Sequence, residues 1–258
     1  MLINTEFHPF NRYISLVFFH TPKSGGSTVN ELIVNSGVYN RPFHGRTILN
    51  YIVETPEKMS KYDFFSGHIT HDCLPLLPSN FFGFTFLRQP INRVMSLYSY
   101  FREMDLAYTD LLSDRIQVEA ISLAKELTIM GWLINDSRNP FVSVLTENSV
   151  ARQFVPSSFF DHNNAAAPEV IVSTFKKFIN THCQFVGFQE TFFQDIYRLF
   201  DILSLPKPTT IPLLNSSRAL FSTSDVHDVT DWCQTHNRLD SELYAWSLEK
   251  FSKAIPVI

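Results

Sequence analysis

A short glycine-rich segment carries the side chains best suited to binding an anion. Residues 20–28 read His-Thr-Pro-Lys-Ser-Gly-Gly-Ser-Thr. The paired glycines, Gly25 and Gly26, allow a backbone to approach a ligand closely. Lys23 adds a positive charge. Three hydroxyl side chains lie in the same segment: Ser24, Ser27 and Thr28. Such a segment before a helix is suited to holding a phosphate, because a helix N-terminus presents N–H groups and the positive end of the helix dipole.

The order of these residues separates the segment from one common phosphate site. The P-loop of nucleotide hydrolases places a lysine after its second glycine. Here Lys23 precedes both glycines. On glycine content alone, the segment could equally be a tight strand-to-helix turn with a surface lysine. Its full string resembles the 5′-phosphosulfate loop of sulfotransferases that use 3′-phosphoadenosine 5′-phosphosulfate (PAPS). It is most similar to the membrane-anchored carbohydrate group, which includes heparan sulfate 2-O- and 6-O-sulfotransferases.

A second segment, residues 84–98, resembles the same family. The matching positions are Arg88, Pro90, Arg93, Ser96 and Tyr98. The resemblance implies that Arg88 and Ser96 bind the 3′-phosphate of PAPS. A guanidinium suits this task because it holds a phosphate through two parallel donors. Position 89 is Gln where Asp is common in the family.

The candidate base lies between these two motifs, in residues 64–73 (FFSGHITHDC). The resemblance implies that the histidine of the Gly-His pair, His68, takes the proton of the acceptor hydroxyl. An imidazole suits this role near neutral pH. His71 could instead be the base or position the acceptor. Two other interpretations remain: a buried strand-end histidine, or a zinc site of His68, His71, Asp72 and Cys73. The spacing crowds these ligands, and the sequence has no second cluster.

Weaker matches extend the resemblance from about Ser15 to Phe251. The family has an Asn and an Arg four residues apart near its acceptor cleft, which implies a substrate-binding role for Asn148 and Arg152. A solvated helix face is the alternative. A late loop that covers the nucleotide is represented by residues 214–218, with Ser217 as a donor-binding residue. Residues 237–251 resemble the closing helix of the family, N-x-x-D-x-x-L-Y.

The elements that must position these residues alternate between strands and helices. Apolar runs rich in β-formers predict four strands: Tyr13–His20, Tyr62–His68, Phe81–Leu87 and Gln184–Phe188. Helical spacing predicts helices at Ser27–Asn35, Ile91–Glu103, Asp114–Ile134, Val142–Phe154, Glu190–Leu203 and within Asp225–Phe251. This alternation favours an α/β fold with a parallel sheet covered on both faces. We expect one P-loop-like, three-layer domain over residues 1–258.

Composition limits the partners and the compartment. The net charge is −4 and no long basic run is present, so nucleic acid is not expected as the main partner. The 25 phenylalanines must be buried or used for binding. Three scattered cysteines favour a reducing compartment. Neither a signal peptide nor an apolar run of about 20 residues is evident, so we expect a soluble cytoplasmic protein.

These observations predict a sulfotransferase that moves a sulfuryl group from PAPS to a hydroxyl of a saccharide, a glycolipid or a small natural product. No metal is expected, because no acidic pair resembles a Mg²⁺ site. Two other classes remain as alternatives. A kinase-like P-loop protein would need a lysine after the second glycine and a Mg²⁺ carboxylate. A non-catalytic nucleotide-binding module would need neither Lys23 nor His68, and both are present.

Overall fold

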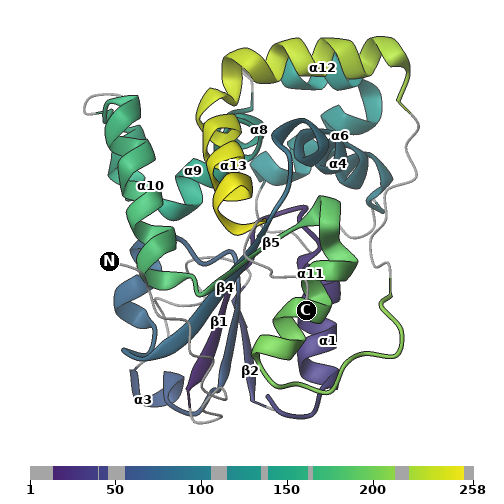
Figure 1. Cartoon of the computed structure of the whole chain (residues 1–258). Coiled ribbons are helices and arrows are strands. Elements are labelled where there is room, and N and C mark those ends of the chain that lie inside the picture. Colours follow the sequence, from purple (N-terminus) through teal and green to yellow (C-terminus); the bar gives the residue numbers. More distant parts are fainter. Residues whose placement is uncertain are drawn as a thin grey trace.

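A parallel β-sheet forms the centre of the fold (Figure 1). The computed structural model describes residues 14–39, 41–45, 56–105, 115–134, 139–161, 165–212 and 221–252. Within these ranges the sheet has five strands in the order β2-β3-β1-β4-β5. Their bounds are β1 (Ser15–Phe19), β2 (Pro42–Gly45), β3 (Phe64–Gly67), β4 (Phe81–Leu87) and β5 (Phe185–Phe188).

The strand order places β1 between β3 and β4. Phe19 at the end of β1 pairs with Gly67 at the end of β3, and β1 also pairs in parallel with β4. The chain leaves β1 towards β2 on one side, whereas it leaves β4 towards β5 on the other. Ligands of open parallel sheets bind outside the carboxyl ends of the strands at such a reversal. A ligand site is therefore expected at the loops after β1, β3 and β4.

Helices cover both faces of the sheet. On one face lie α1 (Gly26–Asn35) and α11 (Phe192–Ile202), and on the other lie α9 (Ser149–Phe154), α10 (Pro168–His182) and α13 (Arg238–Phe251) (Figure 1). Side chains alternate between these faces along each strand. Phe18 packs on the α1 side, and the next residue, Phe19, packs against Phe178 of α10 with ring centroids 5.2 Å apart. The strand phenylalanines therefore build the core on both faces.

A further group of helices packs beside the sheet rather than on it. This group contains α4 (Pro90–Glu103), α6 (Arg115–Glu126), α7 (Ile129–Ile134), α8 (Pro140–Thr146) and α12 (Thr223–His236), packed around a separate cluster that includes the buried Trp132 (Figure 1). The remaining short segments are α3 (Pro56–Met59), η1 (His71–Leu76), η3 (Ser157–Phe160) and η4 (Gln189–Thr191). Because α4 starts directly after β4, it connects this group to the carboxyl edge of the sheet.

The predicted α/β fold with a helix-covered parallel sheet is confirmed, and two of its predicted helices are each divided. The predicted helix Asp114–Ile134 breaks before α7, where Thr128 Oγ1 accepts a hydrogen bond from the N–H of Gly131 at 3.1 Å. A threonine in this position caps a new helix. The predicted helix Val142–Phe154 breaks at Asn148, whose φ of 46° lies in the left-handed region.

Strand β2 and helix α10 were not predicted. In the described ranges, no helix combines the length and the apolar character needed to cross a membrane.

Candidate active site

Three segments meet at the carboxyl ends of β1, β3 and β4. The glycine-rich loop follows β1, His68 follows β3, and Arg88 follows β4. Two hydrogen bonds join them: Arg88 Nη1 donates to the carbonyl of Lys23 at 3.0 Å, and His68 Nδ1 lies 3.1 Å from the carbonyl oxygen of His20. The two phosphate-type motifs and the candidate base are therefore parts of one site.

The backbone of the loop is strained at Lys23. Lys23 has a φ of 65° and Gly25 a φ of 82°, both in the left-handed region. This conformation costs a residue with a side chain about 1–2 kcal/mol, while glycine adopts it readily. The bond from Arg88 to the Lys23 carbonyl holds the loop in place. Helix α1 then starts at Gly26, and the N-cap residue, Gly25, has no side chain to cap it. Strain that persists in this way is typical of functional sites.

The two glycines are also required by packing. A Cβ atom on Gly25 would lie 2.5 Å from the ring of Phe192 and 2.6 Å from Gln189 Oε1. A Cβ atom on Gly26 would lie 1.9 Å from the imidazole of His20. Protein therefore already fills the space beside both residues, and the glycines let the loop sit directly on its support.

The hydroxyl groups of the loop have different surroundings. Ser24 is fully buried, and its Oγ has no hydrogen-bond partner among the described residues. Thr28 Oγ1 donates to the carbonyl of Pro212 at 3.0 Å, which ties α1 to the segment that leads towards the predicted late loop. Ser27 is exposed. Ser217 of the late loop lies outside the described residues.

The ammonium group of Lys23 lies over an aromatic ring of α4. Its Nζ is 3.9 Å from the centroid of the Tyr100 ring. The pKa of Lys23 is lowered to about 8, mainly by burial and also by the positive charge of Arg88, while Glu103 opposes both effects. Lys23 therefore loses part of its charge at mildly alkaline pH, and an anion placed beside it would restore that charge.

Arg88 contacts the loop from the end of β4, and Ser96 lies on α4. Arg88 is half-buried, and its Nε is a buried donor without a partner among the described residues. Burial lowers the pKa of its guanidinium, and the carboxylate of Glu190 opposes this. Ser96 precedes Tyr100 by one helical turn, so the two residues share the face of α4 that Lys23 contacts. Their binding of a 3′-phosphate stays a prediction.

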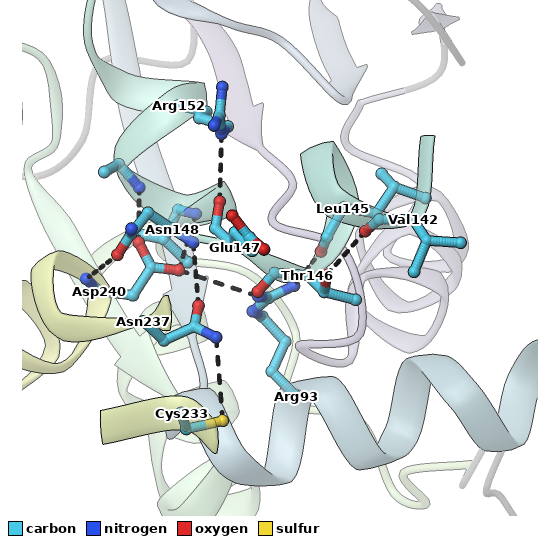
Figure 2. Close-up of polar contacts among 12 residues, drawn as sticks. Arg93, Val142, Leu145, Thr146, Glu147, Asn148, Arg152, Cys233, Asn237 and Asp240 are labelled. Atoms are coloured by element: carbon cyan, nitrogen blue, oxygen red, sulfur yellow. Dashed lines mark hydrogen bonds and ion pairs between the residues drawn. The ribbon is translucent and has the colours of Figure 1, made fainter. Parts of the chain in front are cut away.

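Two other residues of the same motif support the fold instead. The guanidinium of the fully buried Arg93 donates to the carbonyls of Leu145 and Thr146, at 2.8 Å and 3.0 Å, at the C-terminal end of α8 (Figure 2). Tyr98 donates its hydroxyl to the carbonyl of Leu127 at 2.7 Å. The second motif therefore combines residues at the site with residues that fix α4 to its neighbours.

The geometry of His68 is suited to a general base. A carbonyl oxygen can only accept a hydrogen bond, so the contact with His20 requires the proton on Nδ1 and leaves the lone pair on Nε2. His68 keeps solvent-exposed surface, yet the surrounding protein lowers its pKa by burial, and the hydrogen bond to His20 opposes this. His68 is therefore neutral near pH 7, the state that accepts a proton.

The imidazole of His20 forms the support beneath this base. The two rings are 4.9 Å apart between centroids, and the His20 ring also stacks on Phe18 at 5.3 Å. Burial, then the charges of His68 and Lys23, lower the pKa of His20 to about 3. A neutral His20 adds no charge repulsion when His68 takes up a proton.

His71 lies in different surroundings from His68. Its ring centroid is 5.9 Å from that of Phe178 on α10, and its Nδ1 is 3.4 Å from Asp72 Oδ1. Cys73 is buried, with its Sγ 3.6 Å from Thr70 Oγ1. Across the described ranges, no group of three His, Cys, Asp or Glu residues is arranged to hold a metal ion. The zinc interpretation therefore gains no support.

Asn148 and Arg152 make contacts within and beside α9. Asn148 Oδ1 accepts a hydrogen bond from the N–H of Asp240 at 3.2 Å (Figure 2). Arg152 donates from Nε to the carbonyl of Glu147 at 3.1 Å, and its guanidinium lies 4.3 Å from the centroid of Phe160. Their predicted role in binding an acceptor is neither supported nor opposed by these contacts.

Sequence reasoning missed three contributors to this site: His20 as a support, Tyr100 beside Lys23, and Gln153. Gln153 donates from Nε2 to the carbonyls of His20 and Ile69, at 3.2 Å and 3.1 Å. Each contact joins residues far apart in the chain, so no local pattern could reveal it.

The chain is similar to sulfotransferases. Residues 8–126 match the model of the sulfotransferase family, and this range contains the glycine-rich loop, His68, Arg88 and Ser96. The match supports the predicted resemblance at the level of sulfotransferases, while the heparan sulfate subgroup stays a prediction. No curated protein matches the sequence.

Two solved structures are similar to the chain. One is a sulfotransferase from Alicyclobacillus acidocaldarius, with 11% identity and a TM-score of 0.47 over 89% of this chain and 96% of that one. Another is mouse sulfotransferase SULT7A1 complexed with PAP, with 13% identity and a TM-score of 0.42 over 91% of this chain and 84% of that one. Both TM-scores lie below 0.5, so neither assigns a role to a residue.

Proposed function

We propose that this chain is a sulfotransferase that uses PAPS as its donor and a hydroxyl group as its acceptor. The observation that carries the proposal is the meeting of the glycine-rich loop, Arg88 and His68 at three adjacent strand ends. The residues fit an anionic donor. Ser24 Oγ and Arg88 Nε are buried polar atoms without partners among the described residues, and buried polar groups normally have partners.

The loop and Arg88 would hold the two phosphate ends of the donor. Backbone N–H groups of residues 25–28 at the start of α1, together with Lys23, would bind the 5′ end. Arg88 and Ser96 would bind the 3′-phosphate, and Ser217 would complete the donor site. Bound PAPS would supply the sulfuryl group and leave as PAP. Lys23 would stabilise the negative charge that builds up beside it during transfer.

His68 would take the proton of the acceptor hydroxyl on Nε2. Its Nδ1 is already engaged with the His20 carbonyl, so the lone pair has a fixed direction. The remaining contribution is positioning, because binding both reactants in one geometry removes much of the entropic cost of their encounter.

The acceptor class follows from the resemblance to carbohydrate sulfotransferases. We propose a saccharide or glycolipid hydroxyl, with a small natural product as the other class to test; His71, Asn148 and Arg152 would contact it. Residues 1–258 would form a single catalytic domain. The three cysteines are free and buried, which favours a reducing compartment, and we propose a cytoplasmic location.

The test is calorimetric titration of the purified protein with PAP, with ATP in the absence of Mg²⁺ as the control. Binding of PAP but not of ATP, weakened at least tenfold in Arg88→Ala, is expected because hydrogen bonds to charged groups contribute about 1.5–3 kcal/mol. Absence of PAP binding would refute the proposal.

With PAP binding established, transfer from radiolabelled PAPS to panels of saccharides and glycolipids identifies the acceptor. A kinase-like function is disfavoured because Lys23 precedes the two glycines of the loop instead of following them. A non-catalytic module would bind PAP but label no acceptor, which separates it from the enzyme.

A further inference from the structure

The carbonyl of His20 is a shared hydrogen-bond acceptor. It accepts hydrogen bonds from His68 Nδ1 at 3.1 Å and from Gln153 Nε2 at 3.2 Å. A carbonyl oxygen has two lone pairs, so these two donors occupy both. Gln153 is therefore attached to the same oxygen that fixes the ring of His68.

The amide of Gln153 can adopt only one orientation. Its Nε2 also donates to the carbonyl of Ile69 at 3.1 Å, so both amide protons are used. Ile69 directly follows His68, whereas His20 follows β1. Gln153 thus joins the ends of β1 and β3 on either side of the base. A flipped amide would place its oxygen against two carbonyl oxygens with no proton between them, which is unfavourable.

Helix α9 holds Gln153 in this position. Gln153 is only 6% exposed. The first turn of α9 is capped from α13, because Asp240 accepts hydrogen bonds from the N–H groups of Val150 at 3.0 Å and Ala151 at 2.8 Å. Asp240 also lies 3.8 Å from Arg93, which fixes the end of α8 (Figure 2). The donor groups of Gln153 are therefore set by a buried network and not by a mobile surface chain.

We propose that Gln153 is a positioning residue for His68. By holding the His20 carbonyl, it keeps the His68 proton on Nδ1 and the lone pair on Nε2. The role of this lone pair as a base rests on the proposed sulfotransferase function, whereas the tautomer itself does not. Outer hydrogen-bond partners have a comparable effect at metal sites, where they fix the tautomer of a ligating histidine. Their mutation there lowers metal affinity or activity about 10–100-fold.

The experiment is long-range ¹H–¹⁵N NMR of the full chain with ¹⁵N-labelled histidine at pH 8, with His68 assigned from a His68→Gln spectrum. The wild-type protein is expected to show neutral His68 protonated on Nδ1. Gln153→Met keeps a side chain of similar size without its donors. If Gln153 holds the His20 carbonyl opposite Nδ1, the variant weakens the His68–His20 hydrogen bond, and the tautomer ratio is expected to shift about tenfold towards the form protonated on Nε2, the effect of one net hydrogen bond. The matched control is Gln184→Met, whose amide oxygen accepts from the N–H of Gly83 at 2.7 Å in the same sheet.

Three outcomes would overturn the proposal: an Nε2-protonated His68 in the wild type, an unchanged tautomer ratio in Gln153→Met, or an equal shift in Gln184→Met. If Gln153→Met does not fold, Gln153→Asn, which keeps the donors but is too short to reach both carbonyls, is expected to shift the ratio in the same direction. The wild-type spectrum remains decisive without any variant. PAP titration of the same samples separates the two proposals, because a tautomer shift in a protein that does not bind PAP refutes only the sulfotransferase.

Discussion

Binding of PAP should draw a proton onto Lys23. The pKa of Lys23 is lowered to about 8 by burial and by Arg88, so about half of the molecules carry the charge at pH 8. A phosphate beside an ammonium group favours its charged form, and opposite charges at short range shift a pKa by about 1–3 units. The complex therefore binds more protons than the free protein, and the affinity for PAP must fall as the pH rises.

The size of this effect follows from the same values. If the pKa of Lys23 rises from about 8 to about 10 in the complex, PAP binding takes up about 0.5 proton at pH 8, and the affinity falls about tenfold between pH 7 and pH 9. The phosphates of PAP are almost completely ionised at pH 8, where the uptake is measured, because their second pKa lies near 6. Neither His20, with a pKa of about 3, nor His68, with its lowered pKa, titrates there.

The assay is calorimetry at pH 8 in two buffers of different ionisation enthalpy, whose difference in observed heat gives the number of protons taken up. Lys23→Arg is the matched variant, because a guanidinium stays charged throughout and should abolish the uptake while PAP still binds. Zero uptake in the wild-type protein, or the same uptake in Lys23→Arg, would refute the reasoning.

Three further predictions concern the base and its supports. His68→Ala should lower the rate of sulfuryl transfer to an identified acceptor about 10²–10⁴-fold while PAP still binds, and full activity would remove His68 as the base. Gly26→Ala places a Cβ atom 1.9 Å from the ring of His20, so the free energy of unfolding should fall by about 1–3 kcal/mol in a thermal unfolding experiment. An unchanged Tm would contradict the packing. Asp240→Ala leaves Arg93 buried without its carboxylate, so the free energy of unfolding measured in denaturant should fall by about 3–5 kcal/mol. A fall below about 1 kcal/mol would show that the pair contributes little to stability.

The sheet was largely predictable because its strands are short apolar runs that end at obvious breaks. Phe81–Leu87 matches β4 in full, since Arg-Gln-Pro follows it directly. Strand β2 lies at the edge of the sheet and reads Pro-Phe-His-Gly, so it has no run of apolar residues to mark it. Helix α10 did carry a signal: its buried residues Ile171, Val172, Phe175, Phe178 and Ile179 follow helical spacing. Helix α10 was therefore predictable from the sequence, although it was not predicted.

The site was predictable only where its residues follow strands directly. The loop after β1, His68 after β3 and Arg88 after β4 converge because the parallel strands that precede them are neighbours. The contacts that orient these groups come from other elements. Tyr100 meets Lys23 from the far end of α4, and Gln153 reaches the His20 carbonyl across 133 residues of chain. Such contacts depend on tertiary packing, which no local spacing encodes.

Helix α4 explains why one sequence motif contains both site residues and structural residues. Its Tyr100 ring contacts Lys23 of the loop, while Arg93 is buried in the interior and holds the end of α8. The same arginine lies beside Asp240, which caps α9, and α9 carries Gln153 beneath the base. The helix that contacts Lys23, α4, and the helix that carries Gln153, α9, thus share one buried polar network (Figure 2). A buried charge without its partner is strongly destabilising, so this network favours a single arrangement of α4, α8 and α9. That arrangement would in turn fix the distance between the groups that would hold the donor and His68, which would activate the acceptor.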